Sequence, residues 1–282
     1  MYTLLDGRKI SKEIKSDLKI KVEQLKEIGV TPGLAVILVG QDSASKIYVN
    51  LKSKSCIELG IYYEEYFLDE NISEEKLLNL IDELNKKDII NGILVQSPLP
   101  KHINENKVFQ KISSKKDVDG FNPINAGKLF LGQDGFVPCT PFGIMKLLKS
   151  YDINIEGKHA VVIGRSNIVG KPMAHLLLDE NATVTVCHSR TKNLKHITAN
   201  ADILIVAIGK GNFVTSDMIK KDAIVVDVGI TRDKSGKIFG DVDFENVKDK
   251  TSYITSVPGG VGPMTIAMLM YNVIQSAKIK II

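Results

Sequence analysis

The chain has 282 residues, of which 44% are hydrophobic and 25% are charged, an ordinary globular composition that allows one large domain or two of moderate size. Its formal charge of +4 comes from 37 basic and 33 acidic residues that are interspersed along the chain. There is no basic block and little of the aromatic interleaving that stacks nucleobases, which argues against a nucleic-acid partner. A charged N-terminal segment, and the absence of an uncharged apolar run of about 18 residues, lead us to expect neither a leader peptide nor a membrane span.

The three cysteines, Cys56, Cys139 and Cys187, are an odd and widely spaced set without metal-ligand spacing. They are typical of reduced thiols in a reducing compartment. We therefore expect a cytoplasmic protein without a metal site.

Helix and strand patterns alternate along the first part of the chain. Apolar residues recur at spacings of three and four between Ile10 and Ile28, which predicts an amphipathic helix that ends near Gly29. The next patterns predict a strand at 34–39, a helix that ends at Leu59, a strand at 61–68, a helix at 73–86 and a strand at 92–96. Strands that alternate with helices need crossover connections, so we expect a mainly parallel sheet covered on both faces.

Residues 97–141 interrupt this alternation with several prolines and glycines, and we place a domain junction near their end. From Lys158 the alternation resumes, with a helix after the first of the strands expected at 159–163, 183–187, 203–207 and 224–228. This order is typical of the dinucleotide-binding half of a doubly wound sheet. We therefore predict a two-domain α/β protein, with an N-terminal α/β catalytic domain at 1–140 and a Rossmann-type, doubly wound dinucleotide-binding domain at 141–262. A last helix at about 263–282 is expected to pack back on the first domain.

A dinucleotide site is predicted where the strand ending at Gly164 runs through a turn into a helix. Such a turn presents free backbone N–H groups and the positive end of the helix dipole, which bind pyrophosphate well. Gly164 and Gly170 do not meet the G-x-G-x-x-G pattern, however. Because a buried strand followed by glycine is common in α/β proteins, glycine spacing alone leaves the cofactor site open.

The end of the second strand indicates which dinucleotide is bound. An NAD site favours Asp or Glu at this point, whereas this chain has Ser189 and Arg190, a hydroxyl and a cation suited to a 2′-phosphate. Arg165 adds a second cation at the first turn. The alternative is that both arginines are solvated surface charges. Their placement at two strand ends that line one crevice favours NADP.

Candidate reactive groups lie in the first domain. Tyr48 and Lys52 are four residues apart in a predicted helix and share a face. Short-chain dehydrogenases use the same spacing, but there the pair follows the glycine-rich turn, whereas here it precedes Gly164; an ordinary surface Tyr and Lys remains the alternative. Gln96 ends a buried strand at the edge where α/β sheets bind ligands, although its amide would also satisfy loop backbone. Asp119, taken alone, fits an ordinary turn former.

Six segments in order carry a family signature: Tyr-Val-Asn-Leu-Lys at 48–52, Val-Gln-Ser-Pro-Leu-Pro at 95–100, Lys-Asp-Val-Asp-Gly-Phe at 116–121, Pro-Cys-Thr-Pro at 138–141, Gly-Arg-Ser-Asn-Ile-Val-Gly at 164–170 and Pro-Gly-Gly-Val-Gly-Pro-Met-Thr at 258–265. Together they resemble the bifunctional methylenetetrahydrofolate dehydrogenase/cyclohydrolase family, and the resemblance covers nearly the whole chain. Agreement at six ordered places is not credible as chance.

The resemblance implies roles for individual residues. Lys52 corresponds to the family's catalytic lysine, with Tyr48 as its neighbour over the folate and Gln96 as its partner. Asp119 corresponds to the acidic residue that holds the pterin. Further substrate contacts are expected at Val95, Pro258, Gly259 and Gly260. Contacts with NADP are expected at Gly164, Arg165, Ser166, Ser189, Arg190 and the backbone near Ile230.

The resemblance also implies an activity. The protein would oxidise methylenetetrahydrofolate with NADP and hydrolyse the methenyl product to formyltetrahydrofolate, in the one-carbon metabolism linked to purine biosynthesis. It would be a cytoplasmic homodimer that binds tetrahydrofolate derivatives, with the active site in the cleft between its domains. Two alternatives remain: an NADP-binding sensor or scaffold without turnover, and a dehydrogenase that lacks the hydrolase step. The presence of Lys52 with Gln96 and Asp119 disfavours the first.

Overall fold

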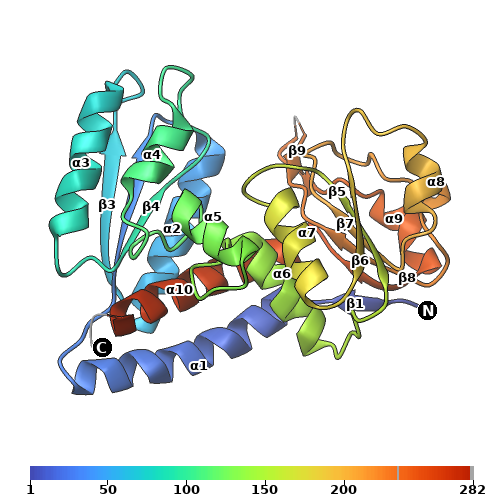
Figure 1. Cartoon of the computed structure of the whole chain (residues 1–282), viewed down its shortest axis with the longest axis horizontal. Helices are drawn as coiled ribbons and strands as arrows, with labels where there is room; N and C mark the ends of the chain where they lie inside the picture. The colour runs from blue at the N-terminus through green and yellow to red at the C-terminus, as the bar shows by residue number, and fades with distance from the viewer. Residues whose placement is uncertain (234, 280–282) are drawn as a thin grey trace. The chain divides into compact units, whose positions relative to one another are not determined.

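The computed structural model describes residues 1–233 and 235–279, and for Ser43 and Ala44 it describes the backbone alone. Contacts divide the chain into two compact units: unit 1 comprises residues 1–12 and 140–265, and unit 2 comprises residues 13–139 and those from Ile266 onward. Figure 1 shows strands and helices together in each unit, which confirms the expected two-domain α/β architecture. Within the described ranges, no helix is both long and apolar enough to cross a membrane.

Unit 2 is built on a three-stranded parallel sheet in the order β3-β2-β4. Its elements are most of α1 (Gly7–Glu27), β2 (Gly33–Val39), α2 (Ser43–Leu59), β3 (Tyr62–Leu68), α3 (Glu74–Lys86), β4 (Gly92–Val95), α4 (Glu105–Lys111), α5 (Pro123–Phe130) and most of α10 (Val261–Ile279). All seven residues of β2 are buried, as expected for a parallel strand with both faces covered. On one face, Ile37 and Ile93 belong to a core with Leu77 and Ile81 of α3 and Phe109 of α4.

Local signals explain where the helices of unit 2 begin and end. At the start of α2, the Asp42 carboxylate accepts a hydrogen bond from the Ser45 N–H at 2.7 Å, and Gly60 ends the helix with φ +72°. Ser73 caps α3 through the Lys76 N–H, with acidic residues in the first turn. Helix α2 therefore ends, and helix α3 begins, close to the residues expected from the sequence.

Unit 1 contains a six-stranded, entirely parallel sheet in the order β1-β11-β8-β7-β5-β6. Its elements are β1 (Thr3–Leu5), α6 (Cys139–Ser150), β5 (His159–Ile163), α7 (Gly170–Asp179), β6 (Thr183–Cys187), α8 (Leu194–Thr198), β7 (Ile203–Val206), β8 (Ala223–Asp227), β9 (Thr231–Arg232), β10 (Ile238–Phe239), α9 (Phe244–Val247), β11 (Thr251–Thr255) and the short 3-10 turns η1 (Ser216–Met218) and η2 (Lys248–Lys250). The doubly wound sheet expected from the sequence is confirmed.

The two strands at one edge of this sheet, β1 and β11, differ from the expectation. We expected residues 1–140 to form one domain, but Thr3 pairs with Tyr253 and Leu5 pairs with Thr255. The first twelve residues consequently group with unit 1. Neither strand was expected, because β1 is only three residues long and β11 mixes polar and apolar residues.

Two buried polar side chains attach the second half of α10 to the rest of unit 2. Asn272 Nδ2 donates to the carbonyl oxygens of Val118 at 2.8 Å and Val137 at 3.1 Å. Ser276 Oγ donates to the carbonyl oxygen of Asn91 at 2.6 Å. Because buried carbonyls need donors, these bonds fix the helix along the segment that precedes and follows Asp119.

Asn272→Ala should lower the free energy of unfolding by about 1–3 kcal/mol, because two carbonyl groups lose their donor in the interior. Urea denaturation measures the loss. Gln275→Ala in the same helix is the control, since Gln275 is only partly buried. A loss no larger than that of the control would contradict this account of α10.

Candidate active site and cofactor site

In unit 2, the buried amine of Lys52 is paired with the partly buried amide of Gln96. Lys52 lies on α2 and is 8% exposed, and its Nζ donates to Gln96 Oε1 at 2.8 Å. Gln96 follows β4 directly: its backbone N–H donates to the Ile37 carbonyl at 2.8 Å and its Nε2 donates to the Ser97 carbonyl at 2.8 Å. The side-chain amide is therefore held with its oxygen towards Lys52.

Burial changes the protonation of Lys52. Loss of hydration lowers the pKa of its amine below the ordinary value of 10.5, while nearby Asp119, Cys139 and Cys56 act in the opposite direction. Burial also raises the pKa of Asp119, and this rise is opposed by Lys52 and by a hydrogen bond from Cys139. The arrangement thus favours a neutral amine more than an exposed lysine would.

Two further expected residues lie next to this pair along the chain. Tyr48 is partly buried on α2, one turn before Lys52, so the two share a helix face. Val95 is the last residue of β4 and is 3% exposed. The structure therefore brings α2 and the end of β4 together at Lys52, as the sequence predicted for a ligand-binding strand end.

The segment that contains Asp119 is held by its neighbour Asp117. Asp117 is 1% exposed and accepts hydrogen bonds from the N–H groups of Phe121 and Asn122 and from Asn125 Nδ2. Burial raises the pKa of Asp117 to about 7, even though these hydrogen bonds act to lower it. The turn that carries Asp119 is therefore anchored from inside.

Lys116 anchors the same segment from its other end. Its Nζ donates to the carbonyl oxygens of Leu84 and Lys87, each at 2.9 Å, at the C-terminal end of α3. A cation at this point complements the helix dipole as well as the unpaired carbonyls. The position of Asp119 thus depends on α3.

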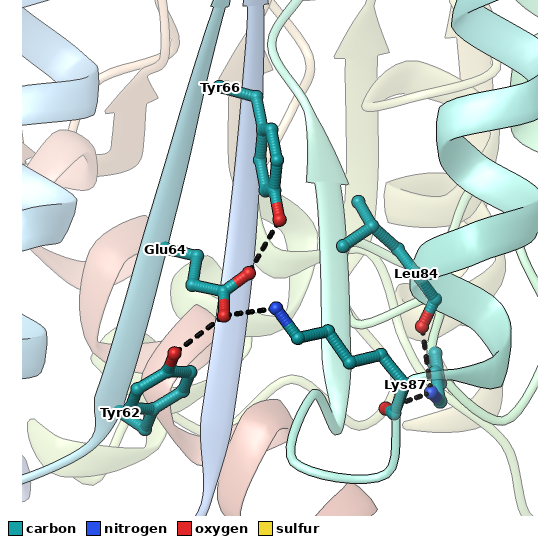
Figure 2. Close-up of polar contacts among 6 residues, drawn as sticks. Tyr62, Glu64, Tyr66, Leu84 and Lys87 are labelled. Carbon is teal, nitrogen blue, oxygen red and sulfur yellow. Dashed lines mark hydrogen bonds and ion pairs between the residues drawn. The ribbon is translucent and has the colours of Figure 1, made fainter.

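Lys87 links this anchor to the edge strand β3. Figure 2 shows Glu64 on β3 accepting hydrogen bonds from Tyr62, Tyr66 and Lys87, at 2.5, 2.6 and 2.5 Å. Although burial acts to raise it, these bonds lower the pKa of Glu64 to about 2. Glu64 therefore remains a carboxylate that ties β3 to the segment after α3.

Two buried cysteines, which the sequence analysis did not place in the site, lie close to Lys52. Cys139 is 1% exposed, and its thiol lies 3.3 Å from the Val118 carbonyl. Cys56 is fully buried with its sulfur 3.6 Å from that of Met270. Burial raises the pKa of Cys56 to about 12 and that of Cys139 well above 9.0, so both are protonated and poor nucleophiles. In the sequence, only the presence of Cys139 in the family motif at 138–141 could have indicated that it lies in the site.

In unit 1, the turn after β5 has the close backbone contacts that a dinucleotide site requires. Gly164 has φ +131°, and a Cβ added there would lie 2.4 Å from the Ala207 carbonyl oxygen. A Cβ added at Gly170 would lie 2.3 Å from the Gly164 oxygen. Ser166 Oγ accepts from the Gly170 N–H at 3.3 Å, at the start of α7. Both positions need glycine, which explains a motif that differs from G-x-G-x-x-G.

The three side chains expected to meet a 2′-phosphate emerge from two adjacent strand ends. The Gly164 N–H donates to the Cys187 carbonyl at 2.9 Å, so the turn after β5 lies beside the turn after β6. Arg165, Ser189 and Arg190 are all exposed on these turns. The structure thus brings both cations to one edge of the sheet, with their side chains accessible to a ligand.

The remaining expected residues also belong to unit 1. Ile230 follows β8 and is 48% exposed. Pro258 is exposed, whereas Gly259 accepts a hydrogen bond from the Arg8 N–H at 3.0 Å and Gly260 is buried. This stretch is therefore hydrogen-bonded to the N-terminal segment of the same unit.

The burial of all three thiols leads to a simple prediction. Cys56, Cys139 and Cys187 are 0–1% exposed, and burial raises the pKa of each. A chromogenic thiol reagent at mildly alkaline pH should therefore react with none of them in the native protein and with all three after denaturation. Rapid modification of a thiol in the native protein would contradict the protonation assigned to the site.

Comparison with known proteins agrees with this geometry. Residues 5–119 match the catalytic domain of the tetrahydrofolate dehydrogenase/cyclohydrolase family, and residues 138–281 match its NAD(P)-binding domain. A bifunctional protein FolD from Campylobacter hominis is 62% identical over 275 residues, covering 98% of this chain and 97% of that protein.

Two solved structures are similar over the full length. The FolD methylenetetrahydrofolate dehydrogenase/cyclohydrolase from Campylobacter jejuni is 57% identical with a TM-score of 0.97, and the alignment covers 99% of this chain and 100% of that one. The Trypanosoma brucei enzyme complexed with NADP and an inhibitor is 37% identical with a TM-score of 0.96, over 99% and 98%. This chain belongs to the tetrahydrofolate dehydrogenase/cyclohydrolase family.

Proposed function

We propose that this protein oxidises methylenetetrahydrofolate to methenyltetrahydrofolate with NADP and hydrolyses the product to formyltetrahydrofolate. The observation that carries the proposal is the buried Lys52 amine, which is hydrogen-bonded to Gln96 and lies within electrostatic reach of Asp119. The glycine-lined turn after β5 and the family of the chain support the oxidation. The bifunctional FolD relatives support the combination of the two reactions.

The oxidation depends on positioning. Loss of hydride from a carbon between two nitrogens leaves a cation that those nitrogens stabilise, so no protein acid or base is needed. When bound, NADP supplies the hydride acceptor. We assign Asp119 to the pterin edge, Tyr48 to the folate face and the backbone at 258–260 to further substrate contact. We also assign Val95, the last residue of β4 before Gln96, to substrate contact.

The hydrolysis depends on Lys52. In the proposed step, a water oxygen bonds to the methenyl carbon while a water proton passes to the neutral Lys52 amine. The Lys52 ammonium returns this proton to the departing nitrogen as one carbon–nitrogen bond breaks, and the remaining hydroxyl proton is released to solvent, which leaves the formyl group. Burial lowers the pKa of Lys52 and so increases the fraction of neutral amine. Gln96 accepts one amine hydrogen and thereby orients the lone pair. Lys52 is the catalytic residue and Gln96 orients it.

Cofactor selection is assigned to unit 1. Gly164, Gly170 and Ser166 shape the turn that receives the pyrophosphate at the start of α7, and Ile230 lies near the nicotinamide end. Arg165, Ser189 and Arg190 are exposed and fit a 2′-phosphate. We also propose a cytoplasmic homodimer, for which light scattering on the purified protein is the test of assembly.

Two absorbance measurements separate this function from its alternatives. Purified protein given methylenetetrahydrofolate and NADP should form NADPH, and added methenyltetrahydrofolate should lose its absorbance faster than in buffer. A sensor or scaffold would do neither, and a dehydrogenase without the hydrolase step would do only the first. Absence of NADPH formation, or a methenyl absorbance that decays no faster than in buffer, would overturn the bifunctional assignment.

Lys52→Met should abolish the hydrolysis, because it removes the amine that accepts the water proton. NADP affinity should stay near that of the unmodified protein, because Lys52 lies in unit 2 and the residues assigned to NADP lie in unit 1. Lys54→Met is the matched control, since Lys54 is exposed on the same helix. In the unmodified protein the hydrolysis rate should rise with pH and level off below pH 10.5, because the neutral amine is the active form and burial lowers its pKa. Hydrolysis by Lys52→Met at the original rate would refute the assignment.

Arg165→Ala should weaken NADP binding roughly tenfold and leave NAD binding little changed, because only NADP carries the phosphate that the guanidinium meets. The measurement is the ratio of kcat/KM with NADP to that with NAD. Lys158→Ala removes the same charge at the opposite end of β5 and should leave the ratio unchanged. If Arg165→Ala also leaves it unchanged, Arg165 is a solvated turn residue.

A further inference from the structure

Asp241 is a fully buried carboxylate in unit 1, between β10 and α9. Its Oδ2 accepts hydrogen bonds from the backbone N–H groups of Ile208 at 2.8 Å and Gly209 at 2.9 Å. Its Oδ1 is buried and has no hydrogen-bond partner among the described residues. Burying a carboxylate is costly, so its retention here is explained by the two loop amides that it holds.

The loop held by Asp241 packs directly on the dinucleotide turn. Ile208 and Gly209 follow Ala207 at the end of β7, and the Ala207 N–H donates to the Ile163 carbonyl at 2.9 Å. The Ala207 carbonyl is the atom that an added Cβ at Gly164 would meet at 2.4 Å. Asp241 therefore fixes the backbone that packs against the turn after β5, although its side-chain hydrogen bonds go to neither that turn nor β5.

A second carboxylate extends the same anchor to the loop after β8. Asp227 Oδ1 accepts from the N–H groups of Gly229 at 3.0 Å and Asp241 at 2.9 Å, and its Oδ2 accepts from Val242 at 2.8 Å. A Cβ added at Gly229 would lie 2.1 Å from the Asp241 Cγ. The backbone that leads to Ile230 thus lies directly against the Asp241 carboxyl group.

Both anchored loops lie on one side of the point where the strand order reverses. In the sheet, β6 lies on one side of β5, and β7 and β8 lie on the other. A dinucleotide spans such a switch point at the carboxyl ends of the strands, with its two halves on opposite sides. Because the 2′-phosphate side chains emerge beside β5 and β6, the loops at 207–209 and 228–230 face the nicotinamide half.

We propose that Asp241 is a positioning residue for the nicotinamide half of the bound dinucleotide. The inference rests on the proposed NADP binding in unit 1. Asp241 holds the backbone of the loop after β7 through two hydrogen bonds and packs against the backbone of Gly229. Removing its carboxylate leaves the Ile208 and Gly209 N–H groups without an acceptor in the interior. The loop that follows β7 then loses its defined position.

Calorimetric titration with two ligands tests the proposal. NADP occupies both halves of the site, whereas adenosine 2′,5′-bisphosphate occupies only the adenosine half. Asp241→Ala should raise the Kd for NADP roughly tenfold and that for the fragment less than about twofold. Asp241→Asn, which keeps an acceptor oxygen for both amides, should recover most of the NADP affinity. Asp179→Asn, an exposed carboxylate of α7, is the control and should bind both ligands normally.

A second variant keeps the test decisive if Asp241→Ala does not fold. Gly229→Ala would push a methyl group against the Asp241 carboxyl group without removing it, and should show the same selective loss of NADP affinity. In each folded variant, hydrolysis of methenyltetrahydrofolate without cofactor should continue at the original rate, since Lys52 lies in unit 2.

The outcomes separate this proposal from the proposed function. Equal losses for NADP and the fragment, no loss for NADP, or an Asp241→Asn variant as weak as Asp241→Ala would each overturn the positioning role. Failure of the unmodified protein to bind either ligand would instead overturn NADP binding itself, and the inference with it.

Discussion

Removing the Lys52 amine from water is the constraint on which the catalytic unit depends. A buried ammonium is costly, so the amine tends towards its neutral form unless the surroundings stabilise the charge. Asp119 opposes that tendency, and Gln96 offers a neutral oxygen that accepts from either form. The balance works only if all three side chains stay in place. Lys116 and Asp117 meet this need, because they bind the Asp119 segment to backbone groups of the same unit.

Both units use buried carboxylates to hold loop backbone. Asp117 in unit 2 accepts two N–H groups of the segment between α4 and α5, and Asp227 in unit 1 accepts N–H groups from the loop after β8 and from the segment after β10. Burial raises the pKa of each to about 7, while the hydrogen bonds favour the charged form. A short acidic side chain can satisfy several divergent N–H groups, which no apolar residue can do. These hydrogen bonds hold the backbone of both segments in place.

The part of the structure that could be predicted from the sequence is the part governed by local patterns. β5 was placed correctly because a continuous apolar run identifies a buried strand, β6 because Thr and Val alternate along it, and α3 because Ser73 caps it. In the candidate site, the face shared by Tyr48 and Lys52 and the strand end at Gln96 were also visible. The pairing of Lys52 with Gln96 followed only from the family resemblance, whereas the two cysteines beside Lys52 and the loop anchor at Asp241 were not visible. Each depends on segments that are distant in sequence, and no local pattern encodes such pairing.

The pairing of β1 with β11 has a consequence for biosynthesis. Thr3 pairs with Tyr253, which follows 250 residues later along the chain, so synthesis separates the two partners widely. An edge strand of the six-stranded sheet must therefore wait, unpaired, while the intervening chain is made. Contacts of such long sequence separation close slowly, because the entropy of a long loop must be lost before the hydrogen bonds form. β1 thus pairs with β11 only after all the strands that lie between them along the chain have been made.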